Sequence, residues 1–147
     1  MEKFKLTPAV HLFLINENKI LLLRRYNTGY EDGNYSVPAG HLEGGETATE
    51  AMIREAQEEA CIAIRPEDLS MIHIIHRAKH DATGERIDFF LSANQWNGDI
   101  KIGEPNKCDQ LIWFPLDYLP TNIIPYVSSA ISNYKNNILY SEFGWNN

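Results

Sequence analysis

The feature that most constrains the fold of this chain is a strongly patterned helix that the sequence predicts after Gly44 and Gly45. Thr47 and Glu50 match a capping box, in which each side chain bonds the backbone N–H of the other residue. Small and apolar side chains then recur at helical spacing within an arc of about 100°, which predicts one buried face. These side chains are Thr49, Met52, Ile53, Ala56 and Ala60.

A second face of the same helix carries three glutamates. Glu55, Glu58 and Glu59 lie at positions i, i+3 and i+4, so they point the same way, about 120° from the apolar arc. Like charges this close repel, and burial increases the repulsion. Mg²⁺ relieves it because it prefers carboxylate oxygens, and it also accepts phosphate oxygens as ligands. Solvated glutamate faces are common, so the three residues alone leave a metal site and a surface face both open.

Short apolar segments separated by turn residues predict a sheet around this helix. Pro125 suits the first turn of a last helix, whose buried stripe would hold Val127, Ala130, Ile131 and Tyr134. Short, mixed elements of this kind favour an α/β or α+β fold. The predicted strands cover residues 9–15, 20–25, 36–42, 71–77, 87–93 and 111–114, with turns at 16–18 and 81–84, and Pro38 and Gly40 are expected to interrupt the strand at 36–42.

Composition limits the class of protein. A length of 147 residues fits one domain, spanning residues 1–147. The net charge of −7 disfavours a nucleic-acid polymer or an anionic membrane as a partner. Cys61 and Cys108 are too few for a disulfide scaffold, and no signal peptide precedes the first strand, so a cytoplasmic protein is expected. No apolar run approaches the ~20 residues of a membrane span.

Residues 40–62 carry a spaced set of polar residues that resembles the Nudix box, G-x5-E-x7-R-E-U-x-E-E-x-G-U, where U is a bulky aliphatic residue. Two positions depart from it. Ala56 is smaller than the usual aliphatic, and Cys61 replaces the glycine that suits a left-handed helix exit. Cys61 is therefore either strained in that conformation or the helix ends differently. The matching positions are Gly40, Glu46, Arg54, Glu55, Glu58, Glu59 and Ile62.

The resemblance covers roughly residues 7–136 and implies an α/β/α sandwich with a mixed central sheet. It implies that Mg²⁺, or Mn²⁺ in its place, is the cofactor, and that Arg54 orients Glu55 through a charge-assisted hydrogen bond. Glu46 is expected to tie the loop to the helix. The implied metal ligands are the Gly40 carbonyl, Glu55, Glu58 and Glu59.

The catalytic base has two candidates. Family members use either the glutamate that corresponds to Glu55 or a carboxylate on a loop beyond the box. On that loop Asp109 is favoured over Glu104, and a turn or strand-edge charge is the alternative for Asp109. Arg24 and Arg25 alternate in direction on a strand, so one of them can bind substrate phosphate while the other faces away.

The implied activity is metal-dependent hydrolysis of a diphosphate linkage in a small nucleotide-like substrate. A (deoxy)nucleoside triphosphate, cut to a nucleoside monophosphate and pyrophosphate, suits a chain of this length. The alternative is a catalytically silent Nudix-fold module that binds or senses a nucleotide. Such modules usually lack one or more box acids, whereas all are present here, which favours an enzyme. A homodimer is common in the family.

Overall fold

The strand β1 (Thr7–Asn16) organises the fold because both of its faces are apolar. In the computed structural model, which describes residues 1–146 of the predicted domain, Leu12 and Leu14 pack toward one layer and Phe13 toward the other. Successive side chains of a strand point to opposite faces, so a strand buried on both faces lies between two layers. The predicted strand at residues 9–15 is confirmed.

β1 lies at the centre of a mixed sheet in the order β3-β2-β1-β6-β5-β8. It runs parallel to β6, and β5 runs parallel to β8, while the other pairs are antiparallel. β4 pairs with the first half of β1, and β7 pairs with β2. The strands are β2 (Lys19–Arg25), β3 (Tyr35–Ser36), β4 (Ala39–His41), β5 (Ser70–Arg77), β6 (Arg86–Ala93), β7 (Cys108–Pro115) and β8 (Tyr140–Phe143).

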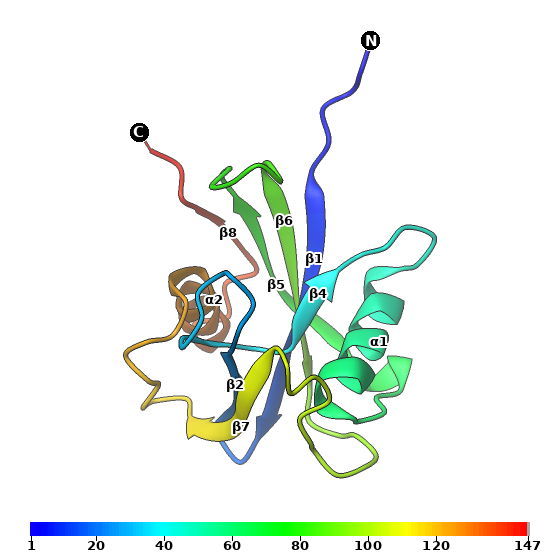
Figure 1. Cartoon of the computed structure of the whole chain (residues 1–147), viewed down its shortest axis with the longest axis vertical. Helices are drawn as coiled ribbons and strands as arrows, with labels where there is room; N and C mark the ends of the chain where they lie inside the picture. The colour runs from blue at the N-terminus through cyan, green and yellow to red at the C-terminus, as the bar shows by residue number, and fades with distance from the viewer. Residues whose placement is uncertain (147) are drawn as a thin grey trace.

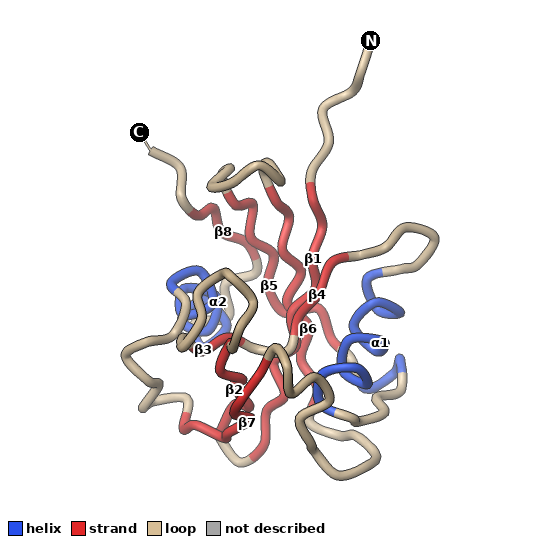
Figure 2. The backbone as a smooth tube through the Cα atoms, viewed as in Figure 1, coloured by secondary structure: helices blue, strands red, loops and turns tan. Residues whose placement is uncertain are grey.

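Two helices cover the sheet from opposite sides (Figure 1). α1 (Ala48–Ala60) packs with Val10, Leu12 and Leu14, and α2 (Pro125–Lys135) packs on the face that carries Phe13. Figure 2 shows the strands between the two helices. A 3-10 turn, η1 (Pro66–Asp68), leads from α1 toward β5. The predicted α/β/α sandwich with a mixed sheet is confirmed.

Both ends of α1 follow the sequence pattern. The Thr47 hydroxyl accepts from the Glu50 amide at 3.1 Å, and the Glu50 carboxylate accepts from the Thr47 amide at 2.9 Å, so the capping box is confirmed. Cys61 has φ 62° and ψ 29°, which is the left-handed exit that normally favours glycine. The amide of Gly103 donates to the Glu59 carbonyl at 3.0 Å and satisfies one backbone acceptor at this helix end.

The buried face of α1 differs from the predicted arc. Ala51 is fully buried and Glu55 is 9% exposed, whereas Thr49 and Ile53 are only half-buried. The face of α1 that packs on the sheet is therefore rotated from the predicted arc toward the glutamates. As a result the glutamates lie closer to the core than the predicted position, about 120° from the buried arc. The shift arises because β4 covers this side of the helix as well as β1 does.

Two predicted strands differ in part from the structure, and one strand was not predicted. The predicted interruption of the strand at 36–42 by Pro38, which has no amide hydrogen, is confirmed, whereas Gly40 does not interrupt it and lies within β4. The strand at 111–114 extends to Cys108–Pro115 because it pairs along the whole length of β2. The edge strand β8 was not predicted; it has only four residues and pairs with β5.

Candidate active site

An acidic cavity of about 460 Å³ opens where α1 meets β4 and the loop that precedes β7. α1 contributes a row of glutamates, and the loop adds Glu104. Arg25 and Arg54 bring positive charge to the same walls, together with Lys107. The carboxylates that line the acidic cavity are Glu43, Glu55, Glu58, Glu59 and Glu104.

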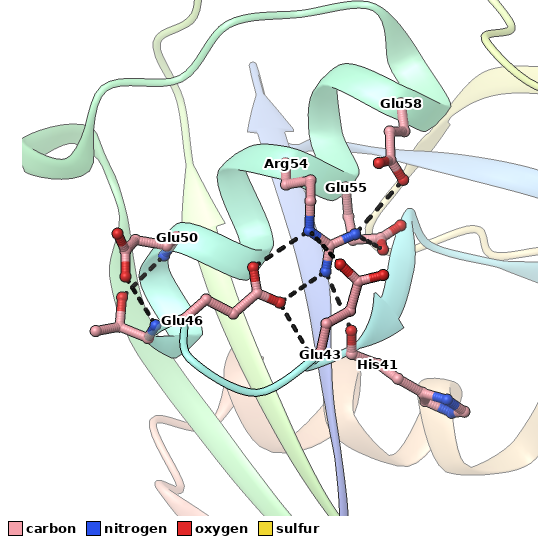
Figure 3. A network of polar contacts seen from close by, with 8 residues as sticks. His41, Glu43, Glu46, Glu50, Arg54, Glu55 and Glu58 are labelled. Atoms are coloured by element: carbon pink, nitrogen blue, oxygen red, sulfur yellow. Dashed lines mark hydrogen bonds and ion pairs between the residues drawn. The ribbon is translucent and has the colours of Figure 1, made fainter.

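Arg54 is the centre of the polar network on this wall (Figure 3). Its guanidinium donates to Glu55 Oε1 at 2.7 Å and to Glu46 through Nη2 at 2.8 Å and Nε at 3.2 Å. A further bond of 3.2 Å reaches the His41 carbonyl, whose ring extends away from the arginine in Figure 3. Arg54 thus joins the loop after β4 to the helix, and its hydrogen bond lowers the pKa of Glu46.

Glu55 is pressed against the backbone of β4. A methyl group at Gly40 would lie 2.2 Å from the Glu55 carboxyl carbon, so only glycine admits the carboxylate at this point. Burial raises the pKa of Glu55, and the hydrogen bond from Arg54 opposes that rise. The glycine and the arginine of the predicted motif therefore act on the same carboxylate from two sides.

Glu59 is half-buried in the wall of the cavity. Its Oε2 accepts a hydrogen bond of 2.7 Å from the Ala39 amide. Burial raises the pKa of Glu59 to about 8 in spite of this bond, and the nearby charges of Glu55 and Glu104 add to the rise. A carboxylate held this way is stabilised in its ionised form by a cation more than by water.

The donor chemistry of this cavity fits a hard divalent cation. The carboxylate oxygens of Glu55, Glu58 and Glu59 are of the type that Mg²⁺ prefers, and the raised pKa values of Glu55 and Glu59 indicate that the negative charge of these two is poorly compensated. Within residues 1–146 no three acidic, histidine or cysteine side chains converge into a ready-made metal cage. Arg54 bonds Glu55 and the Ala39 amide bonds Glu59, while Glu58, whose side chain is 48% exposed, lies 3.5 Å from Arg54 on the same cavity wall.

The two arginines of β2 have separate positions. Arg25 lines the acidic cavity and donates to the Tyr30 carbonyl at 2.7 Å. Arg24 points elsewhere and forms a two-bonded ion pair with Asp109, at 2.8 and 2.7 Å. The alternation along the strand thus puts Arg25, and not Arg24, beside the glutamates.

Asp109 is absent from the described walls of the acidic cavity, whereas Glu104 is one of them. The hydrogen bonds from Arg24 lower the pKa of Asp109. A carboxylate whose pKa is lowered by an ion pair is a weak base, and Glu104 rather than Asp109 lines the cavity, so the geometry favours Glu104 as the loop carboxylate.

A second cavity of about 280 Å³ adjoins the first and shares Arg25, Ala39, Gly40 and His41 with it. We call it the basic cavity, because three arginines line it and Asp81 is the one carboxylate among its described lining residues. Its residues come from distant segments, and sequence reasoning missed them. The signal available in the sequence was a charged or histidine residue within an apolar strand, as at His11, Arg77 and Asp88. Asp88 lies beneath the basic cavity, where it bonds both His11 and Arg77. The residues that line the basic cavity include Ala9, His11, Tyr30, Arg77, His80, Arg86 and Tyr126.

Comparison with protein families identifies the motif. A model of the NUDIX domain matches residues 5–132. An ADP-ribose pyrophosphatase of Methanocaldococcus jannaschii is 31% identical over 124 residues, which cover 82% of this chain and 70% of that protein. An 8-oxo-dGTP diphosphatase of Escherichia coli is 27% identical, over 84% of this chain and 95% of that protein.

The fold matches solved structures as well. A MutT NUDIX hydrolase from Burkholderia pseudomallei superposes with a TM-score of 0.79 at 22% identity, covering 88% of this chain and 98% of that one. This likeness shows a shared fold. Neither helix in the described part of the chain has the length and hydropathy that a membrane span needs.

Proposed function

This chain belongs to the Nudix hydrolase family, and from that premise we propose that it is a magnesium-dependent pyrophosphatase acting on a small nucleotide. Its substrate would be a (deoxy)nucleoside triphosphate or a related nucleotide with a diphosphate linkage. Hydrolysis between the α and β phosphates of a triphosphate yields a nucleoside monophosphate and pyrophosphate. Mn²⁺ would serve in place of Mg²⁺.

The observation that carries this proposal is the set of crowded carboxylates on α1. Glu55 is buried and Glu59 is half-buried, both with raised pKa values, and the more exposed Glu58, one turn after Glu55, lines the same cavity. A protein gains little from such a cluster unless a cation binds it, because each ionised carboxylate destabilises the next. All acidic positions of the family motif are present, which favours an enzyme over a silent nucleotide-binding module.

Each residue of the acidic cavity would have a separate role in the reaction. Glu58, Glu59, Glu55 and the Gly40 carbonyl would hold the metal, which when bound polarises phosphoryl oxygens and lowers the pKa of a coordinated water. Arg54 would fix the orientation of Glu55.

A proton acceptor for the attacking water would come from Glu55 or from Glu104, which faces the same cavity. We place Asp109 behind both because Arg24 already occupies it. Arg25 would bind a substrate phosphate from the wall that the two cavities share, whereas Arg24 would act only by holding Asp109.

The relatives support a nucleotide substrate without choosing one. One is named for ADP-ribose and the other for 8-oxo-dGTP, and both compounds contain a phosphoanhydride between nucleotide phosphates. The shared feature is the diphosphate linkage, which is the part of the substrate that the acidic cavity would hold. The base and the second substituent would contact residues outside the family motif.

The test is release of phosphate from a panel of nucleotides with Mg²⁺, with Mn²⁺ and with EDTA, with a phosphatase added to reveal monoester products. Canonical and oxidised triphosphates, ADP-ribose, nucleotide sugars and dinucleoside polyphosphates form the panel. We expect turnover that EDTA abolishes. Glu58→Gln should lower kcat by at least about 100-fold, or about 2.7 kcal/mol, with an unchanged melting temperature.

The matched control is Glu67→Gln, which neutralises an exposed glutamate on η1 and should leave kcat unchanged. Turnover that survives EDTA, or an undiminished kcat in Glu58→Gln, would contradict the metal assignment. A folded protein that binds nucleotides and turns none over would favour the silent module.

A further inference from the structure

The basic cavity inverts the charge of the molecule around it. The chain carries a net charge of −7, yet the guanidinium groups of Arg25, Arg77 and Arg86 all line this cavity. Asp81, on the hairpin between β5 and β6, is the opposing charge among the described lining residues. A concave site lined with several guanidinium groups attracts an anionic group and can bind it through paired hydrogen bonds.

The arginine at the base of the cavity is held rigidly. Arg77 is 5% exposed and bonds Asp88 through Nε at 2.9 Å and Nη2 at 3.2 Å. Asp88 also accepts from His11 Nε2 at 3.0 Å. Although burial opposes ionisation of Asp88, the bonds from His11 and Arg77 keep its pKa below the usual value, so both ions persist. A side chain fixed in this way loses little entropy when a ligand binds.

Two buried polar atoms in the described residues lack a hydrogen-bond partner, and both belong to side chains that line this cavity. They are Arg86 Nε and His11 Nδ1. Arg86 uses its other nitrogens on His41 at 3.1 Å and on Thr83 at 2.8 Å, which leaves Nε as a donor without an acceptor. Buried donors are nearly always paired in native proteins, either by protein groups or by ordered water, so Arg86 Nε is a donor not used by the chain itself at this cavity.

The two tyrosines of the basic cavity are each engaged by an arginine on one face. The Arg77 guanidinium lies over the Tyr126 ring at 3.8 Å from its centre, and the Arg25 guanidinium lies over Tyr30 at 5.2 Å. One face of each ring is therefore already covered by a cation. This arrangement disfavours a base and leaves hydrogen bonding by the guanidinium groups as the main recognition chemistry.

The basic cavity also has a fixed place relative to the reaction. It shares Arg25, Gly40 and His41 with the acidic cavity, so the two are joined across β4. A substrate whose diphosphate occupies the acidic cavity can extend its next group into the basic one.

We propose that the basic cavity is a specificity site that binds one further anionic group of the substrate, a phosphate or a carboxylate, beyond the hydrolysed diphosphate. Arg77 and Arg86 are the residues that read this group, and Arg25 bridges it to the diphosphate. The inference rests on the proposed pyrophosphatase function and names the class of substrate within it.

Two matched substrate pairs test the proposal, because each pair differs by one anionic group. UDP-glucuronate and UDP-glucose differ by a sugar carboxylate, and dGTP and dGDP differ by a terminal phosphate. We expect kcat/KM to favour the more anionic member of at least one pair by about tenfold or more, the range of one charge-assisted hydrogen bond. The pair that responds identifies which source of the anion the cavity accepts.

Arg86→Gln connects the preference to the cavity. It should reduce the preference at least fivefold, mainly through KM, while Arg86→Lys, which keeps the charge, should retain part of it. Lys101→Gln removes an exposed positive charge outside both cavities and should leave the ratio unchanged. A ratio near one for both pairs in the wild-type protein, or a ratio that Arg86→Gln leaves intact, would overturn the proposal.

A binding measurement separates this proposal from the catalytic one. Titration of the same four nucleotides into Glu58→Gln by calorimetry reports the preference without turnover. Absence of turnover in the wild-type protein contradicts the proposed hydrolase. An equal affinity for both members of each pair contradicts the specificity site, whatever the catalytic result.

Discussion

The acidic and basic cavities meet at β4 but hold their charges in opposite ways. In the basic cavity Asp88 and Arg77 neutralise one another, and Asp88 is fully buried with its pKa below the usual value. In the acidic cavity the pKa of the half-buried Glu59 is raised to about 8, and its bond partner is a neutral amide. Arg77 therefore has a buried counter-charge beneath the basic cavity, whereas a cation bound in the acidic cavity would compensate Glu59.

The difference indicates where each cavity affects stability. A buried ion pair whose members are both present is close to neutral for folding, but the loss of one member leaves an unpaired buried charge. An uncompensated carboxylate instead destabilises the fold whenever it ionises, so its effect depends on pH. A substitution in the ion pair should therefore reveal how much the basic cavity contributes to folding stability. A change of pH should reveal how much the acidic cavity contributes.

Asp88→Asn should have the largest effect on stability. It leaves Arg77 as a buried cation without a counter-charge, and we expect the free energy of unfolding to fall by about 3 kcal/mol or more. Urea denaturation followed by circular dichroism measures the change. The matched control is Asp117→Asn, which breaks the exposed pair with Lys135 and should cost less than about 1 kcal/mol. Equal losses in the two variants would show that Arg77 is not a buried charge.

The two cavities also differ in how much of them the sequence could predict. Residues 40–59 supply half of the residues that line the acidic cavity, and four of its five carboxylates. Helical spacing alone placed Glu55, Glu58 and Glu59 on one face, and the capping box fixed where the helix begins. Local periodicity is sufficient for a site that is local in sequence.

The basic cavity could not be predicted in this way. His11, Arg77 and Arg86 meet only because β1 and β5 both pair with β6, and a single sequence does not reveal the order of strands. The same limit explains the preference for Asp109 over Glu104. Strand alternation predicts that Arg24 and Arg25 diverge, but only the pairing of β2 with β7 shows that Arg24 meets Asp109.

The pH dependence of stability should show the contribution of Glu59. Burial raises its pKa from about 4.5 unfolded to about 8 folded, so the stabilising effect of its protonated form is complete below pH 4.5 and is lost as pH rises through 8. Between pH 6 and 7.5 we expect the metal-free protein to lose about 2 kcal/mol from this group. Unfolding in EDTA at several pH values provides the measurement.

Glu59→Gln isolates this contribution because glutamine is neutral at every pH and keeps an oxygen for the Ala39 amide. The difference in stability between wild type and variant should change with pH over this interval, while histidine titrations, common to both proteins, cancel. Saturating Mg²⁺ should remove most of the wild-type loss, since the cation binds the ionised form. A constant difference across the interval would mean that Glu59 titrates normally and that the acidic cavity is already compensated.

The smallest expected effect concerns backbone strain at the C-terminal end of α1, the helix that carries the glutamates. Cys61 has φ 62°, a conformation that costs a residue with a Cβ roughly 1 kcal/mol. Cys61→Gly should therefore raise the free energy of unfolding by about 0.5 kcal/mol, after the greater entropy of glycine in the unfolded chain is subtracted. Cys61→Ala keeps the strain and removes only the thiol, so it should give no such gain. If Cys61→Gly lowers stability as much as Cys61→Ala does, then packing of the thiol near Gly103 outweighs the backbone strain. In that case the end of α1 is stabilised by a contact that the glycine of the family motif cannot make.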